Sequence, residues 1–157
     1  MPSIFFYQTE IGKIGIAESG GALTNLYFPG EPVPADMAVH ETDILQEAGR
    51  QLRSYFAGRR QDFTLPLAPR GTDFRRRVWA SLCAIPYGKT RSYRQIAQSV
   101  CNAKAARAVG MANNKNPLPI FIPCHRVTGA DGKPVGYGGG LQSKSYLLAL
   151  ENRHAHL

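Results

Sequence analysis

Hydrophobic residues alternate with polar or small residues over the first 30 positions of the chain, as they do in β-strands. The alternation predicts strands at residues 4–7, 13–17 and 22–28, and a later apolar segment predicts one more strand at 63–67. Ser19-Gly20-Gly21 is typical of a hairpin turn. Beyond Thr42 the apolar positions recur every three or four residues, which predicts a helix that ends at Gly58.

The second half of the chain has helical spacing almost throughout. Thr72 or the aspartate after it can cap a first helix, and Ser92 with Gln95 forms the sequence pattern of a capping box. A further helix is expected to begin behind Asn102, with the sequence AKAARAVGMANN, and a last one near Leu141. Two short helices joined by a tight turn, the second basic and rich in small residues, resemble a helix-turn-helix.

These patterns predict an α+β protein in two parts. The proline-bearing segment 65–71 is typical of a connection between lobes. It separates a small N-terminal lobe of strands and a helix, residues 1–70, from a mostly helical C-terminal domain, residues 71–157, that contains the helix-turn-helix. A chain of 157 residues is long enough for this arrangement.

The two parts differ in charge. Residues 1–68 hold 5 lysines and arginines against 8 acidic residues, whereas residues 69–157 hold 14 against 3. A net charge of +11 in the second part favours a polyanion as partner, most simply nucleic acid. A basic surface that serves only solubility explains the same charge equally well at this point.

The second helix of the predicted helix-turn-helix has two different faces. Its core face would hold Ala105, Ala108, Val109 and Ala112, and its other face Ala103, Arg107, Gly110, Met111 and Asn114. Small residues let a backbone come close to a partner, and a single long Arg107 among them suits insertion into a DNA minor groove. The alternative is packing against another helix, with Arg107 solvated.

The segment LPIFIPCHRVTG, residues 118–129, ends an apolar run on a thiol, an imidazole and a guanidinium. A free thiol is only slightly ionised at neutral pH, so a nucleophilic Cys124 needs a base, and His125 is adjacent. A third group should orient the imidazole. Glu151 is the candidate, because it shares a helix face with apolar residues, where a carboxylate needs a partner.

Each of these residues also has an ordinary structural explanation. Cys124 can be a buried core cysteine, His125 a satisfied histidine and Glu151 part of an exposed salt bridge. The glycine-rich segment 136–140, which includes Tyr137, favours a backbone that lies against a planar ligand, and a hinge before the last helix fits it as well.

Several other classes of protein are disfavoured. The cysteines are odd in number and widely spaced, which argues against a disulfide framework, and the absence of CxxC and HExxH pairing argues against a metal site. No apolar stretch approaches the roughly 20 residues of a membrane span, and no signal peptide is evident. We expect a cytoplasmic protein.

The region from Thr72 to Glu151 resembles the O6-alkylguanine-DNA alkyltransferase family. The segments PYGKTRSYRQIA, KAARAVGMANNKNPLPIFIPCHRV and GYGGGLQSKSYLLALE occur in the family's order and spacing. The first 70 residues match only loosely, as a small lobe of strands and a helix. The resemblance implies DNA repair by irreversible, single-turnover transfer of an alkyl group from O6-alkylguanine in duplex DNA to the protein itself. O4-alkylthymine is a further candidate substrate.

The resemblance also implies a role for each site residue. Cys124 accepts the alkyl group, His125 takes the thiol proton through a water held by Glu151, and Tyr93 donates a proton to the departing guanine. Asn116 braces the turn before the active-site segment. The target base would flip out of the stack to reach the thiol. The residues implied in DNA contact are Tyr93, Ala103, Ala106, Arg107, Gly110 and Met111. The residues implied in the base pocket are Val127, Tyr137 and Gly138.

Two departures from the family pattern concern Gly138 and zinc. Gly138 stands where some relatives carry a serine hydroxyl, so one hydrogen bond to the base would be missing or made by backbone. Some relatives hold a structural zinc in the N-terminal lobe, but this chain has no cysteine before Cys83. We therefore expect no metal and no cofactor, and a monomer whose partner is double-stranded DNA.

Three alternatives to the alkyltransferase remain. A non-catalytic relative that flags alkylated DNA for other repair would lack the nucleophile, whereas Cys124 is present. A helix-turn-helix regulator would favour side chains that reach base edges, whereas this helix offers alanine, glycine and one Arg107. A cysteine hydrolase would need an oxyanion hole and has no reason for a basic groove.

Overall fold

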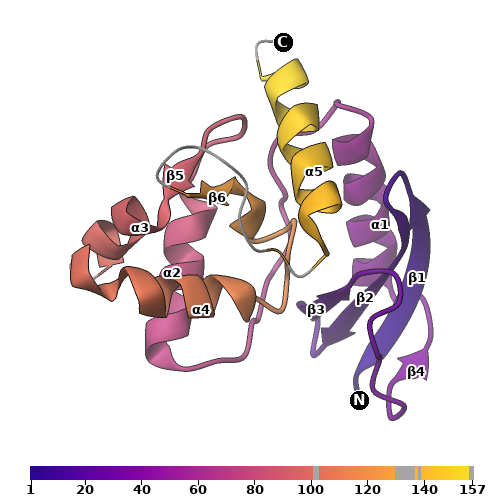
Figure 1. The fold of residues 1–157 in the computed structure, drawn as a ribbon. Coiled ribbons are helices and arrows are strands. Elements are labelled where there is room, and N and C mark those ends of the chain that lie inside the picture. The colour runs from indigo at the N-terminus through magenta and orange to yellow at the C-terminus, as the bar shows by residue number, and fades with distance from the viewer. Residues whose placement is uncertain (101–102, 130–136, 138, 156–157) are drawn as a thin grey trace. The chain divides into compact units, whose positions relative to one another are not determined.

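The computed structural model describes residues 1–100, 103–129, 137 and 139–155. The chain divides into two compact units, Met1–Pro69 and Arg70–Leu157 (Figure 1). The first unit is a small sheet with one helix, and the second is mostly helical. The predicted α+β class is confirmed.

The first unit is built on a four-stranded sheet. Its strands are β1 (Ser3–Thr9), β2 (Gly12–Ser19), β3 (Ala22–Tyr27) and β4 (Ala38–Val39). They lie in the order β3-β2-β1-β4, with antiparallel pairing except between β1 and β4. The alternation of apolar residues predicts the first three strands, whereas β4 is too short to leave a pattern.

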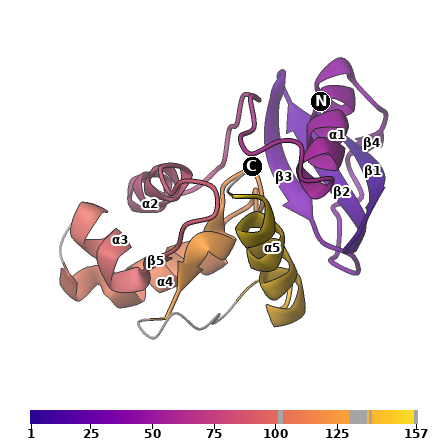
Figure 2. The ribbon, with the colours of Figure 1, turned by 90° about the horizontal axis from the view of Figure 1, so that it is seen from above.

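Helix α1 (Asp43–Phe56) covers one face of this sheet, as Figure 2 shows. Gly49 permits the close approach, because a Cβ atom there would lie 2.5 Å from the ring of Tyr7. The Tyr7 hydroxyl in turn donates to the carbonyl of Leu45 at 2.8 Å. The helix can therefore pack closely against β1, because Gly49 has no side chain and the Tyr7 hydroxyl makes a buried hydrogen bond to the helix.

The strand predicted at residues 63–67 does not form. Only Leu67 makes a bridge there, to Leu23, with the backbone N–H of Leu23 donating to Pro66 at 2.9 Å. Pro66 lacks an N–H, and a second proline follows at residue 69, so the ladder cannot continue. The prediction of a strand was wrong for all but this one bridge.

The second unit holds most of the helices. Its elements are α2 (Asp73–Cys83), β5 (Arg91–Ser92), α3 (Tyr93–Val100), the 3-10 helix η1 (Ala103–Ala105), α4 (Ala106–Asn114), the 3-10 helix η2 (Cys124–Arg126), β6 (Val127–Thr128) and α5 (Leu141–His154). Helices α3 and α4 lie side by side, as the helix-turn-helix pattern predicts (Figure 1). The proposed cap Asn102 lies outside the described residues.

Local hydrogen bonds explain where these helices begin. Thr72 caps α2 by accepting from the N–H of Arg75 at 3.2 Å. Ser92 and Gln95 form the predicted capping box: the Gln95 N–H donates to Ser92 Oγ at 3.1 Å, and the Ser92 N–H to Gln95 Oε1 at 2.8 Å.

Within the described residues, no helix is both long and apolar enough to span a membrane.

Candidate active site

A short parallel pair of strands brings two distant segments together. Arg91 of β5 pairs with Val127 of β6. Tyr93 follows β5 directly, and the 3-10 helix Cys124–Arg126 directly precedes β6. As a result the Tyr93 phenol interacts electrostatically with the Cys124 thiol, although 31 residues separate them. Burial first and then Cys124 raise the pKa of Tyr93.

The turn that leads to the thiol is held by Asn116. Its Nδ2 donates to the carbonyl of Ile122 at 2.9 Å, and its Oδ1 accepts from the N–H of Leu118 at 2.9 Å. Between these contacts Ile120 has φ 74°, a left-handed conformation that costs roughly 1–2 kcal/mol for a residue with a side chain. Asn116 thus stabilises a strained turn, and it also hydrogen bonds to Cys124.

Cys124 is almost fully buried, with 4% of its surface exposed. Burial raises the pKa of its thiol to about 11, although the hydrogen bond from Asn116 and the charge of Lys144 act in the opposite direction. The side chain is therefore a protonated thiol at neutral pH. Nucleophilic attack requires a base that removes this proton as the reaction proceeds.

His125 is suited to be that base. Its Nε2 lies 2.6 Å from Glu151 Oε2, and both side chains are buried. Burial lowers the pKa of His125, and the charges of Arg126 and Lys144 add to this effect against the opposing influence of Glu151. The imidazole is thus neutral at neutral pH. The nitrogen that faces the carboxylate carries the proton, which makes Nδ1 the basic atom.

Glu151 stays ionised because Arg126 compensates its charge. Burial alone would raise the pKa of Glu151, but the hydrogen bonds from His125 and Arg126 and the charge of Arg126 lower it far below its usual range. Arg126 Nε lies 2.8 Å from Glu151 Oε1 and Nη2 lies 3.0 Å from Oε2, so the contact is bidentate. Its third nitrogen donates to the carbonyl of Ile85 at 2.7 Å.

A second buried cation, Lys144, lies near the thiol. It is fully buried, and its Nζ donates to the carbonyl of Val127 at 2.6 Å. Sequence reasoning missed both Lys144 and Arg126. Helical spacing contained the signal for Lys144, because it lies three residues before Leu147 and seven before Glu151, on the same face of α5.

The residues predicted to contact DNA lie on or before α4. Arg107 and Met111 are exposed, and 58% of the Met111 surface is accessible. Ala106 and Gly110 are half-buried, and a Cβ atom at Gly110 would lie 3.9 Å from the Tyr93 ring. Ala103 belongs to the 3-10 helix before α4.

The core face of α4 differs from the predicted one. Ala108 is exposed, and the buried positions are Val109, Ala112 and Asn113. The helix is anchored by Trp79, whose indole N–H donates to the carbonyl of Ala112 at 2.8 Å. This large side chain selects which stripe of α4 is buried, and small residues such as Ala108 carry too little hydrophobic signal to reveal the choice.

Of the residues predicted for the base pocket, Val127 is fully buried on β6 and Tyr137 is half-buried. Gly138 lies outside the described residues. In the described parts of the chain no group of three or more histidine, cysteine and acidic side chains is arranged to hold a metal ion.

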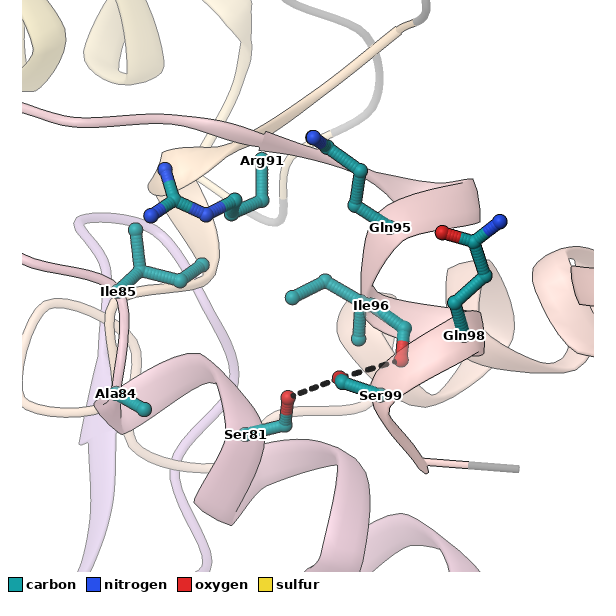
Figure 3. Close-up of a pocket in the computed structure, with 8 residues that line it drawn as sticks. All are labelled: Ser81, Ala84, Ile85, Arg91, Gln95, Ile96, Gln98 and Ser99. Atoms are coloured by element: carbon teal, nitrogen blue, oxygen red, sulfur yellow. Dashed lines mark hydrogen bonds between the residues drawn. The ribbon is translucent and has the colours of Figure 1, made fainter. Parts of the chain in front are cut away.

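A separate hollow of about 510 Å³ lies between the end of α2 and α3 (Figure 3). Arg91, Ile85 and Ile96 border it, and a hydrogen bond of 3.0 Å between Ser81 and Ser99 crosses from one helix to the other. None of the predicted catalytic residues lines this hollow. The proposed chemistry therefore rests on the cluster around Cys124 and not on this hollow.

Comparison with known protein families gives a match for each of the two units. The family model described as 6-O-methylguanine DNA methyltransferase, ribonuclease-like domain matches residues 5–69, and the model described as its DNA binding domain matches residues 73–153.

Individual relatives match over nearly the whole chain. The methylated-DNA–protein-cysteine methyltransferase of Methanosarcina barkeri is 48% identical over 151 residues, covering 94% of this chain and 95% of that protein. The protein of the same name from Mycolicibacterium paratuberculosis is 47% identical over 150 residues, covering 94% and 91%.

Two crystal structures are also similar. The Mycobacterium tuberculosis O6-methylguanine methyltransferase superposes with a TM-score of 0.91 at 42% identity, covering 98% of this chain and 94% of that one. Mycobacterium tuberculosis OGT in complex with DNA gives a TM-score of 0.91 at 43% identity, covering 97% and 94%.

Proposed function

The chain belongs to the 6-O-methylguanine DNA methyltransferase family, and from this premise we propose that it repairs DNA by taking the alkyl group of O6-alkylguanine onto its own Cys124. One observation carries the proposal. A buried thiol lies in the same 3-10 helix as a neutral histidine that is oriented by an ionised glutamate. A thiol that serves only as core filler needs no such neighbours.

The proposed reaction is a displacement at the alkyl carbon. His125 takes the thiol proton while the sulfur bonds to the carbon, and the bond from that carbon to guanine O6 breaks. The electron pair of the broken bond passes to guanine, and Tyr93 protonates the ring so that it leaves neutral. Glu151 stabilises the imidazolium that forms.

The product is a thioether, which is stable to hydrolysis, so each protein molecule reacts once. The methyl group comes from the DNA itself, and no soluble donor takes part. A free thiol that is consumed in this way has to stay reduced until it meets its substrate, which supports a cytoplasmic location. All the proposed groups lie in one unit of one chain, Arg70–Leu157, which supports a monomer.

Duplex DNA is the proposed substrate because the reacting atom must leave the base stack to reach a buried thiol. Exposed Arg107 and Met111, on a helix otherwise rich in alanine and glycine, fit close approach to the minor groove with one side chain inserted. The basic charge of residues 69–157 supplies the attraction to phosphates. The complex of the Mycobacterium tuberculosis relative with DNA supports this assignment.

Intact-mass spectrometry tests the proposal directly. The protein is incubated with a duplex that contains one O6-methylguanine, and we expect a gain of one methyl group, mapped to the peptide with Cys124 and saturating at one per molecule. Tight binding without any mass change would contradict the transfer and would leave a protein that only recognises the lesion.

A further inference from the structure

Asn113 is a buried polar residue that the roles above leave without a purpose. It lies near the end of α4, and 3% of its surface is exposed. Its side chain hydrogen bonds to the phenol of Tyr93, and this bond lowers the pKa of that phenol, against the larger effect of burial. Because Asn113 Oδ1 has no hydrogen-bond partner among the described residues, this bond has the amide N–H as donor and the phenol oxygen as acceptor.

The same stretch of α4 also supports the ring of Tyr93. Gly110 lies three residues before Asn113, and a Cβ atom there would be 3.9 Å from two ring carbons. One face of α4 therefore lies beside the Tyr93 ring and also provides the hydrogen bond to its oxygen.

Stability does not explain an amide at this position. The neighbouring buried positions of α4, Val109 and Ala112, are apolar. The Oδ1 atom of Asn113 is buried and accepts no hydrogen bond from any described residue. An unsatisfied buried oxygen costs free energy, so an apolar side chain of similar shape would stabilise the fold better.

We propose that Asn113 is a positioning residue for the transfer reaction, which occupies a lone pair of the Tyr93 oxygen and so directs the Tyr93 O–H toward the departing guanine. A phenol has one proton, and its direction follows from where its lone pairs are engaged. With the amide donor on one side of the oxygen, the Tyr93 proton can be given to the substrate held at Cys124. This inference rests on the proposed function, in which Tyr93 protonates guanine.

The test is a double-mutant cycle on the rate of a single turnover. Four proteins are compared: wild type, Asn113→Leu, Tyr93→Phe and the double variant. Each is mixed in excess over a duplex containing O6-methylguanine, and the rate constant of methyl transfer is measured. Since general-acid catalysis contributes about 10²–10⁴-fold, we expect Tyr93→Phe to lose about 100-fold and Asn113→Leu about tenfold. The double variant should react no more slowly than Tyr93→Phe alone.

Two further measurements separate positioning from a structural role. The melting temperature of Asn113→Leu should equal or exceed that of wild type, because the unsatisfied oxygen is gone. Its dissociation constant for an undamaged duplex should not change. If leucine prevents folding, Asn113→Ala carries the same cycle, because it removes the donor without adding bulk.

The outcomes divide cleanly. Losses that multiply in the double variant would mean that Asn113 acts independently of Tyr93, and an unchanged rate for Asn113→Leu would mean that the contact is not used; either result overturns the inference. If wild type itself transferred no methyl group, the proposed function would fail first, and the role of Asn113 with it.

Discussion

Buried polar side chains have different roles in the two units. In the first unit the buried Glu18 accepts from the N–H of Gly21 at 3.1 Å, and the buried Gln51 joins Thr64 through two hydrogen bonds. Each of these contacts satisfies local backbone or fixes a loop. In the second unit His125, Arg126 and Glu151 form one buried cluster that begins next to Cys124 in sequence, and buried Lys144 acts on the Cys124 thiol.

The difference shows where the molecule gives up stability for chemistry. A buried ion pair is seldom more stable than a well-packed apolar core, so a cluster of this kind is expected where a reaction needs it. The first unit, with a conventional core, contains none of the proposed catalytic residues. Substitutions at matched positions in the two units therefore test this contrast.

The largest effect is expected from Cys124→Ser. A serine hydroxyl at this buried site is a far weaker nucleophile, so transfer should fall below detection while DNA binding persists. Cys83→Ser is the matched control, because Cys83 is an exposed thiol at the end of α2, and it should transfer normally. Methyl transfer is read by intact mass and binding by fluorescence anisotropy. Normal transfer by Cys124→Ser would refute the mechanism.

Glu151→Gln should cause the largest loss of stability. It leaves Arg126 buried without a counter-charge, which costs about 3–5 kcal/mol in the free energy of unfolding. Glu47→Gln in α1 removes the exposed partner of Arg50 and should change the stability little. Urea denaturation followed by circular dichroism compares the two. Equal effects would abolish the proposed distinction between the units.

Arg107→Ala should act on duplex DNA and hardly on a free base. If the side chain fills the gap left by the flipped nucleotide, its loss should slow transfer from duplex about 10- to 100-fold, as a few kcal/mol of unstacking is no longer compensated. The rate with free O6-benzylguanine should be close to that of wild type. A similar loss on both substrates would argue against insertion.

The stability of the second unit should decrease in acid in two stages. Both His125 and Glu151 have a pKa below the ordinary values of 6.5 and 4.5. Below these values the unfolded chain binds a proton that the folded chain does not, so the unfolding free energy falls, by up to about 1.4 kcal/mol per pH unit for each proton.

The fluorescence of Trp79 follows this transition, because it is the only tryptophan and lies in the second unit. The decrease should begin near pH 6.5 and steepen below pH 4.5. A constant unfolding free energy across this interval would show that His125 is not held neutral by burial.

The smallest effect distinguishes two similar helix starts. Thr72 accepts a hydrogen bond from the first turn of α2, whereas Thr42 makes no side-chain cap on α1. Thr72→Ala should therefore cost about 1 kcal/mol, and Thr42→Ala almost nothing. Thermal unfolding of the two variants decides this, and a larger loss for Thr42→Ala would reverse the assignment.

Sequence reasoning succeeds here where the signal is local or periodic. The first three strands follow from alternation, and the capping box of Ser92 and Gln95 follows from a spacing of three residues. The expected partner for Glu151 follows from its place on a core-facing stripe, and His125 is that partner in the structure. In each case one short stretch of the chain contains the pattern.

The failures concern contacts between elements. Arg126 and Lys144 are charged residues that are usually solvated. Their burial depends on partners distant in sequence, which are Glu151 and the carbonyl of Ile85 for Arg126 and the carbonyl of Val127 for Lys144. Helical spacing predicts Ala108 in the core, but it is exposed, since alanine fits either face of α4. The role proposed for Asn113 depends on a phenol from another helix, which no spacing within α4 reveals.

The raised pKa of Cys124 also affects how well the thiol resists oxidation before the protein binds a lesion. Peroxides and stray electrophiles attack thiolates far faster than thiols. A side chain kept protonated, with 4% of its surface exposed, is therefore poorly oxidised during the long interval before a lesion arrives. Because each protein molecule reacts only once, slow oxidation of the thiol preserves its activity. The packing that raises the pKa of Cys124 therefore also protects this residue from side reactions.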